Sequence, residues 1–158
     1  MDAPGGIGQA GPAAAQAAAW LRGEVSLAAL RGYSEEELAA VAELGYALFR
    51  QGRHDLAGTV FEGLASLTGR EYPLRALAAI AVAARRYAEA LPLLDAAIAR
   101  SRPGLPGRLL RAETLFQLGR YADAQADLDW IIRAAPRDAD EEALRRRATT
   151  LRRRLARP

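Results

Sequence analysis

His54 is the only imidazole in the 158-residue chain, so it is the first side chain to test for acid–base or metal chemistry. A general base needs a nucleophile within reach, and the sequence places no Ser beside His54 and contains no Cys. Tyr87 and Tyr121 occupy the corresponding positions in two later segments of similar sequence. We therefore predict that His54 packs at the start of a helix, as an aromatic residue would.

Carboxylates form three groups that are candidates for an acid pair or a metal site. Two of these groups, 35–37 and 140–142, open predicted helices, where the helix dipole stabilises negative charge without any catalytic role. In the third group Asp123 and Asp127 share a helical face, and Asp129 follows. The single His and the absence of Cys exclude the usual nitrogen and sulfur metal clusters. There is also no Lys to complete a phosphate-binding loop, so we predict no enzyme, no metal and no cofactor.

Two arginine triplets lie near the C-terminus, at 145–147 and 152–154. A separation of seven residues is about two helical turns, so both triplets fall on roughly one face of a helix. Such a stripe attracts phosphate groups, but no aromatic residue is interleaved to stack on bases. We interpret the segment as a solvated capping helix. An acidic protein partner is the first alternative, and a nucleic acid, which we do not expect, is the second.

An internal repeat supplies the elements that position these side chains. Three segments align, 44–67, 77–99 and 111–134, and each carries apolar residues at helical spacing. In each segment a small residue is followed four positions later by a large apolar one: Ala57 and Phe61, Ala90 and Leu94, Ala124 and Leu128. Alternation with a period of two is absent, so no β-strand is predicted. Each helical hairpin has two apolar stripes and must stack on its neighbour to bury both.

The chain divides into four predicted parts: a disordered arm over 1–13, an N-terminal helical segment over 14–33, three repeats over 34–138, and a basic capping helix over 139–158. Residues 14–30 are expected to form one helix, which Gly23 weakens by roughly 1 kcal/mol relative to Ala. Ser34 and Glu37 fit a capping box at the start of the repeats. Pro92 lies inside a predicted helix and is expected to kink it.

No apolar run approaches the roughly 20 residues that a membrane-spanning helix requires. The first eleven residues contain no basic side chain, so they do not form the start of a signal peptide. The sequence therefore predicts a cytoplasmic protein without a membrane span. With 37 alanines and ten aromatic residues, its core must be built mainly from small side chains.

The repeat pattern resembles the tetratricopeptide repeat, a 34-residue helix–turn–helix unit that stacks into a superhelix. In that family two small residues let the paired helices approach closely, and the matching pairs are Gly45 with Ala57, Ala78 with Ala90, and Ala112 with Ala124. The turn glycine is present at Gly52 and Gly119, whereas the middle repeat has Arg85. The resemblance implies an all-α superhelix of three repeats between an N-terminal helix and a C-terminal capping helix.

First helices line the concave face of such a superhelix, which gives nine predicted groove positions: Ala42, Tyr46, Phe49, Arg75, Ala79, Val82, Leu109, Glu113 and Phe116. Large apolar residues at the ends and small ones in the middle form a groove suited to an extended peptide with a few apolar anchors. The alternative is that Tyr46 and Phe49 simply pack between hairpins. The sequence leaves both interpretations open.

Residues 26–134 further resemble the class II chaperones of bacterial type III secretion, which hold translocator subunits. The stretch 26–67 follows that family's order without a gap: a short leading helix, a helix initiated by Ser, the first repeat and an F-x-x-L ending. Residues 112–117, AETLFQ, fit the family pattern in the third repeat. The resemblance implies a small non-enzymatic cytoplasmic chaperone that binds an extended apolar translocator segment in the groove. Tyr46 and Phe49 correspond to the family's groove aromatics.

Members of that family often form homodimers through the segment before the first repeat. The apolar residues of this segment are Trp20, Leu21, Val25, Leu27 and Leu30. The alternative function is a generic tetratricopeptide scaffold or assembly adaptor, whose groove binds a peptide or helix of another protein. A nucleic-acid accessory role through the arginine tail is the third hypothesis.

Overall fold

The computed structural model describes residues 12–101 and 103–155, and in these ranges the regular secondary structure is entirely helical. The helices are α1 (Pro12–Leu21), α2 (Leu27–Leu30), α3 (Glu35–Arg50), α4 (His54–Thr68), α5 (Glu71–Ala83), α6 (Tyr87–Arg100), α7 (Leu105–Gln117), α8 (Tyr121–Arg133) and α9 (Ala139–Leu155). The predicted arm over 1–13 lies outside the described residues except for its last two positions, which belong to α1. No helix in the described ranges is long and apolar enough to span a bilayer.

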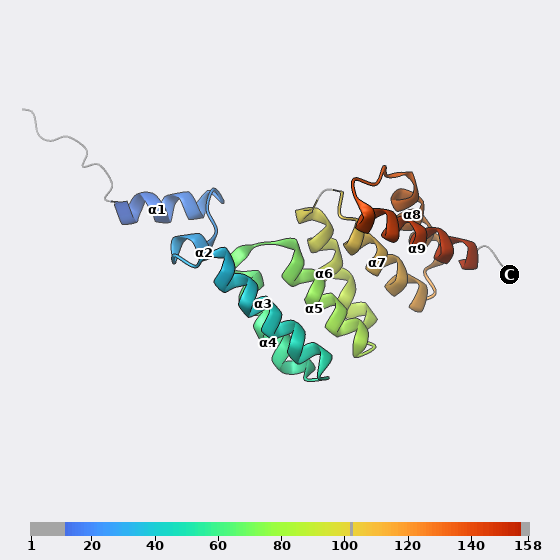
Figure 1. The fold of residues 1–158 in the computed structure, drawn as a ribbon, viewed down its shortest axis with the longest axis horizontal. Coiled ribbons are helices and arrows are strands. Elements are labelled where there is room, and N and C mark those ends of the chain that lie inside the picture. Colours follow the sequence, from blue (N-terminus) through green and yellow to red (C-terminus); the bar gives the residue numbers. More distant parts are fainter. Residues whose placement is uncertain (1–11, 102, 156–158) are drawn as a thin grey trace, which may run out of the picture.

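Three helical hairpins, α3–α4, α5–α6 and α7–α8, stack side by side in chain order (Figure 1). Each helix from α3 onward packs on the next, and α9 completes the array by packing on α8 and α7. Because no hairpin buries both of its apolar stripes alone, this stacking is what creates the core. The predicted all-α superhelix of three repeats is confirmed.

Local sequence signals explain where the hairpins begin and turn. The capping box is present, because the Ser34 hydroxyl accepts from the Glu37 N–H at 3.1 Å and the Glu37 carboxylate accepts from the Ser34 N–H at 2.8 Å. The turns within the first and third repeats use Gly52 and Gly119 at φ +74° and +71°. Arg85 adopts the same left-handed conformation at φ +59°, which is uncommon for a residue with a side chain.

The prediction of one helix over 14–30 is wrong. The helix α1 ends at Leu21, and Gly23 takes a left-handed φ of +74°, which redirects the chain. A separate short helix, α2, then begins after Ser26, whose hydroxyl accepts from the Ala29 N–H at 3.1 Å. As a result α1 contacts α2 and projects from the N-terminal end of the array (Figure 1).

Small side chains at the centre of each hairpin let the two helices approach closely. Ala57, Ala90 and Ala124 are all fully buried. A Cβ atom at Gly45 would lie 2.9 Å from Cζ of Phe61, so only glycine fits opposite that ring. The other two repeats have Ala at the position of Gly45 and the smaller Leu at the position of Phe61. The first repeat therefore has the larger side chain at position 61 and the smaller residue at the facing position 45.

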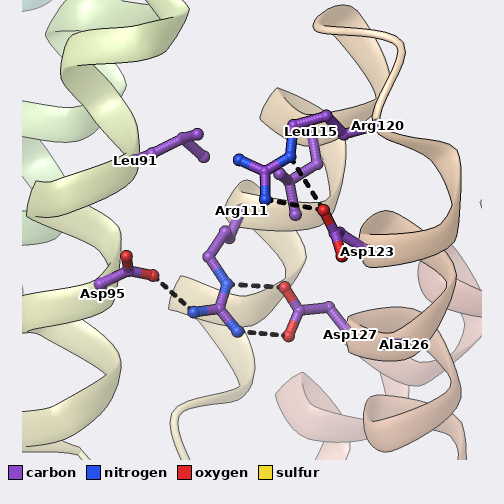
Figure 2. A pocket seen from close by; sticks show the side chains of 8 residues that line it. All are labelled: Leu91, Asp95, Arg111, Leu115, Arg120, Asp123, Ala126 and Asp127. Carbon is purple, nitrogen blue, oxygen red and sulfur yellow. Dashed lines mark hydrogen bonds and ion pairs between the residues drawn. The ribbon is translucent and has the colours of Figure 1, made fainter.

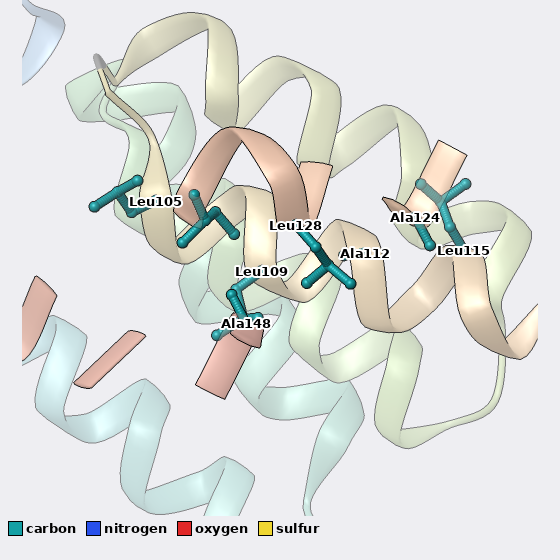
Figure 3. Close-up of a cluster of buried hydrophobic side chains, with 8 residues drawn as sticks. Leu105, Leu109, Ala112, Leu115, Ala124, Leu128 and Ala148 are labelled. Atoms are coloured by element: carbon teal, nitrogen blue, oxygen red, sulfur yellow. The ribbon is translucent and has the colours of Figure 1, made fainter. Parts of the chain in front are cut away.

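The C-terminal part of the core joins α7, α8 and α9. Buried residues of α7 and α8 pack together with Ala148 of α9, which is fully buried (Figure 3). The capping helix thus covers the open end of the third repeat, as another repeat would.

In the second repeat, α6 continues as one helix through Pro92, whose ring is exposed to solvent.

Candidate peptide-binding groove

An apolar pocket of about 140 Å³ lies where the first helices of all three repeats meet. It is lined by Tyr46 and Phe49 of α3, by Tyr72, Arg75, Ala76 and Ala79 of α5, by Leu110 of α7, and by Phe61 of α4. Seven of these eight residues belong to first helices, which form the concave side of a tetratricopeptide superhelix. We call this pocket the anchor pocket.

The walls of the anchor pocket are fixed by contacts within and between helices. The Tyr72 ring packs edge-on against Phe61 with 5.8 Å between ring centroids. The Arg75 guanidinium lies 5.5 Å from the Tyr72 ring centroid, and its Nε donates to the Glu71 carboxylate at 2.6 Å. Burial raises the pKa of Tyr72, so its hydroxyl stays neutral at physiological pH. The pocket is therefore apolar, with one neutralised charge at its rim.

A second apolar pocket, of about 180 Å³, shares the Tyr72 side chain with the anchor pocket. Its apolar lining comes from α3, α4 and α5: Leu38, Ala39, Ala42, Leu64, Tyr72 and Pro73. Arg70 and Glu35 also line it and form a two-pronged ion pair, with N–O distances of 2.6 and 2.5 Å. The hydrogen bonds from Arg70 lower the pKa of Glu35. The two apolar pockets thus share Tyr72 as a lining residue, which suits a ligand with two apolar side chains.

The structure brings five of the nine predicted groove residues to these two pockets: Tyr46, Phe49, Arg75 and Ala79 line the anchor pocket, and Ala42 lines its neighbour. Tyr46 is 54% exposed and so presents its ring to a ligand. Phe49 is half-buried and stacks on His54, with ring centroids 5.4 Å apart. His54 therefore packs as predicted, and Phe49 acts both as pocket lining and as hairpin packing.

The remaining four predicted positions do not line either pocket. Leu109 is 3% exposed and packs in the core beside Ala148, so its assignment to the groove is corrected (Figure 3). The reason is that α9 covers this part of α7. Glu113 is half-buried and pairs with Arg147 of α9 at 2.7 Å.

Val82 and Phe116 are both half-buried within their own hairpins. Val82 packs against the small core shared by α5 and α6, and Phe116 packs on Tyr121 with ring centroids 5.5 Å apart. The two apolar pockets are therefore lined mainly by the first two repeats, and the third repeat contributes Leu110.

Four residues that line the anchor pocket were not predicted as groove residues: Phe61, Tyr72, Ala76 and Leu110. Tyr72 precedes Arg75 by three residues and Ala76 precedes Ala79 by three, so helical spacing places all four on one face of α5. This spacing could have identified Tyr72 and Ala76 from the sequence. Leu110 could not be separated from its neighbour Leu109, because the choice depends on how α9 packs.

A charged cleft of about 340 Å³ lies between α6, α7 and α8 (Figure 2). Arg111 holds both carboxylate oxygens of Asp127 at 2.7 Å and also donates to Asp95 at 2.6 Å. Arg108 adds a third bond to Asp127 at 3.2 Å. The hydrogen bonds that Arg111 donates to Asp127 and Asp95 raise the pKa of Arg111 further above its ordinary value. These bonds make the cleft an ion-pair cluster that joins α6, α7 and α8.

Asp123 does not join Asp127 in an acid pair. It pairs instead with Arg120, at 2.7 Å, on the rim of the same cleft. Within 12–101 and 103–155, no group of three or more His, Cys, Asp or Glu residues is arranged to hold a metal ion.

The five apolar residues predicted for dimerisation fall into two sets. Trp20, Leu21 and Val25 are exposed, at 44%, 76% and 37%. Leu27 and Leu30 are half-buried in α2, which packs on α4. Only the first set is available to a partner.

No family model and no curated protein sequence matches the chain. Solved structures do match. The type III secretion translocator chaperone SycD of Yersinia enterocolitica is 20% identical, with a TM-score of 0.77 over 82% of this chain and 98% of SycD. PcrH from Pseudomonas aeruginosa is 25% identical, with a TM-score of 0.73 over 83% of this chain and 100% of PcrH. PcrH in complex with the chaperone binding region of PopD is 23% identical, with a TM-score of 0.71 over 79% and 95%.

These similarities define the class of fold. The chain has the tetratricopeptide-like fold of the type III secretion translocator chaperones. The resemblance predicted from residues 26–134 is confirmed at this level.

Proposed function

We propose that this protein is a non-enzymatic cytoplasmic chaperone of type III secretion that binds an extended apolar segment of a translocator protein in its concave groove. The observation that carries the proposal is the pair of apolar pockets between α3, α4 and α5 that share the Tyr72 side chain. Two neighbouring pockets of this size hold two apolar side chains of an extended peptide. A folded globular surface would reach them less well.

Proteins of the same fold bind ligands of this kind. PcrH has been solved with the chaperone binding regions of PopD and PopB, and SycD with a peptide of the translocator YopD. A translocator carries apolar segments that aggregate when exposed to water. Burying such a segment in the groove would keep the client soluble and unfolded until export.

The first test is capture of the client from the native host with the tagged protein, followed by titration of peptides from the client's apolar segments. Tyr46→Ala should weaken binding of the matching peptide by about 1–3 kcal/mol, the range for truncating an interface aromatic. Tyr33→Ala is the matched control, because Tyr33 is 49% exposed and lines neither pocket.

Unchanged peptide binding by a folded Tyr46→Ala protein would contradict the groove assignment. Recovery of cytosolic proteins alone, without any secreted protein that has long apolar segments, would favour the assembly adaptor. Circular dichroism of each variant establishes that the helical fold is intact before binding is compared.

We also propose that the exposed residues Trp20, Leu21 and Val25 form a homodimer contact. Three large apolar side chains on one short projecting segment lose unfavourable contact with water when a second copy covers them. Sedimentation equilibrium should show a dimer that the double change Trp20→Ser with Leu21→Ser converts to a monomer. A wild-type monomer at the highest soluble concentration would refute the proposal.

A further inference from the structure

The outer face of α9 carries a continuous basic surface that the groove does not use. Six exposed positions make it up: Ala143, Arg146, Arg147, Thr150, Arg153 and Arg154. At about 100° per residue, these positions span roughly 120° of the helix. Ala148 lies on the opposite, buried face. We call this surface, with its four guanidinium groups and two small residues, the arginine stripe.

Most charges of the arginine stripe lack an intramolecular partner. Arg147 pairs with Glu113 of α7 at 2.7 Å. Arg146, Arg153 and Arg154 form no ion pair with any other residue in the described part of the chain. Three like charges within about two turns repel one another, and an anionic partner relieves that repulsion.

The other arginines of α9 behave differently. Arg145 pairs with Glu142 at 2.9 Å, and Arg152 pairs with Asp129 of α8 at 2.9 Å. Both lie on the side of the helix that faces the protein body. The unpaired charge is therefore confined to the outer face.

Carboxylates border the arginine stripe on both sides and limit its width. Helical geometry places Glu142 beyond one edge, and Asp140 together with Glu113 at the other. A broad polyanion such as a duplex or a charged membrane would meet these carboxylates as well as the arginines. The stripe also contains no aromatic residue to stack on bases and no large apolar residue to enter a bilayer. A ligand about one helix wide avoids both problems.

We propose that the arginine stripe docks an acidic α-helix of another protein, with carboxylates recurring every seven residues. Arg146 and Arg153 are seven residues apart on one side of the stripe, as are Arg147 and Arg154 on the other, which is about 10.5 Å along the axis. Ala143 and Thr150 lie between them with the same spacing, and their small side chains let a second helix approach closely. The two rows of arginines would pair with carboxylates of the ligand helix, one row on each side of a close helix–helix contact.

The test uses the full chain and three fluorescein-labelled probes, two of which are 21-residue peptides. One is a helical peptide with glutamates at seven-residue spacing on one face, and the second has the same composition with the glutamates spread around the helix. The third is a double-stranded oligonucleotide of equal net charge. Fluorescence anisotropy at low salt should give at least about fivefold tighter binding of the striped peptide than of the spread peptide.

The double change Arg146→Glu with Arg153→Glu should weaken binding of the striped peptide by about tenfold or more. Arg146→Gln with Arg153→Gln gives the same direction without introducing negative charge, should the first variant fold poorly. Arg133→Glu is the control, because Arg133 is exposed on α8 outside the stripe. Tyr46→Ala should leave this binding unchanged, which separates the inference from the proposed groove function.

Two outcomes would overturn the inference. Equal binding of the striped and spread peptides would show a general attraction for negative charge. Tighter binding of the oligonucleotide than of the striped peptide would assign the stripe to nucleic acid.

Discussion

The interface between the first two repeats and the interface between the last two solve the same packing problem with opposite chemistry. Leu77 and Leu93 line the cleft between α4, α5 and α6. One repeat later, 34 residues on, Arg111 and Asp127 line the equivalent cleft between α6, α7 and α8. An apolar pair in one interface is therefore an ion pair in the other.

The surroundings of the two clefts are otherwise alike. Their volumes are about 390 and 340 Å³. Each has an ion pair on its rim, Arg86 with Glu89 at 3.1 Å and Arg120 with Asp123 at 2.7 Å. Because the ion pairs on the two rims match, the clefts differ mainly in the central pair of residues, which is apolar in one cleft and charged in the other.

Repeat stacking therefore needs a filled interface but does not require a particular chemistry there. Apolar residues stabilise the stack through burial and adapt easily to small shifts. The Arg111–Asp127 pair has strict geometry, and Arg111 also bonds Asp95, so it connects three helices in one register. Replacing both charges of a buried pair with apolar residues is often neutral or stabilising, whereas removing one of them is costly.

The largest expected effect follows from breaking the buried pair. Asp127→Ala leaves the Arg111 guanidinium, 25% exposed, without its two-pronged partner and should lower the free energy of unfolding by about 3–5 kcal/mol. Asp123→Ala, one turn earlier and exposed, should cost no more than about 1 kcal/mol. Urea denaturation followed by circular dichroism measures both. Similar losses for the two variants would show that burial does not distinguish these pairs.

The next largest effect is expected when the volume of a buried residue in the first repeat is increased. Gly45→Ala places a Cβ atom 2.9 Å from Phe61 and 3.0 Å from Val60, so overpacking should cost about 1–3 kcal/mol. Gly63→Ala, on α4 with no atom within 4 Å of the new Cβ, should stabilise the helix by up to about 1 kcal/mol.

Adding Phe61→Leu to Gly45→Ala recreates the Ala–Leu combination of the other two repeats. The double variant should recover part of the loss in the urea midpoint. If the double variant is no more stable than Gly45→Ala alone, the size of the Phe61 ring is not the reason that position 45 requires glycine.

The repeat architecture was predictable because its signals are local or periodic. Small residues at 33- and 34-residue spacing, the capping box at Ser34 and the turn glycines each act through the backbone or through one neighbouring helix. Helical spacing also brought Tyr46, Phe49, Arg75 and Ala79 to one pocket.

The features that could not be predicted depend on the relative orientation of helices. Arg111 and Asp127 are 16 residues apart on different helices, and each looks like a solvated surface residue in the sequence. The placement of Leu109 in the core depends on α9. The break at Gly23 depends on a single left-handed residue, which the sequence alone allows but does not demand.

A smaller effect is expected when the second interface is converted to the chemistry of the first. Arg111→Leu with Asp127→Leu removes both charges of the two-pronged pair together. Arg108 loses its 3.2 Å bond to Asp127 but keeps its bond to the Pro103 carbonyl and its place over the Trp130 ring. The double variant should be at least as stable as the wild type, in contrast to the loss caused by Asp127→Ala. Urea unfolding gives the free energy. A loss as large as that of Asp127→Ala would mean that the ion pair itself stabilises the stack.

The smallest effect concerns an exposed ion pair that joins the first two repeats, Glu35 with Arg70, whose side chains are 74% and 55% exposed. Its hydrogen bonds lower the pKa of Glu35 below the ordinary value of 4.5. A lowered carboxyl pKa contributes stability above that ordinary value, and this contribution is lost as the pH falls through the lowered pKa. Glu35→Gln should therefore reduce the urea midpoint slightly at neutral pH and not at all in acid.

Salt should affect the exposed ion pair and the buried ion pair differently. High salt should erase the difference between Glu35→Gln and the wild type, since water and ions reach this pair. The loss caused by Asp127→Ala should persist at the same salt concentration, because Asp127 is 4% exposed and its bonds are shielded. If both losses disappeared together in high salt, the Arg111–Asp127 pair would be behaving as a surface pair. The two interfaces would then differ only in residue type, and burial would no longer separate them.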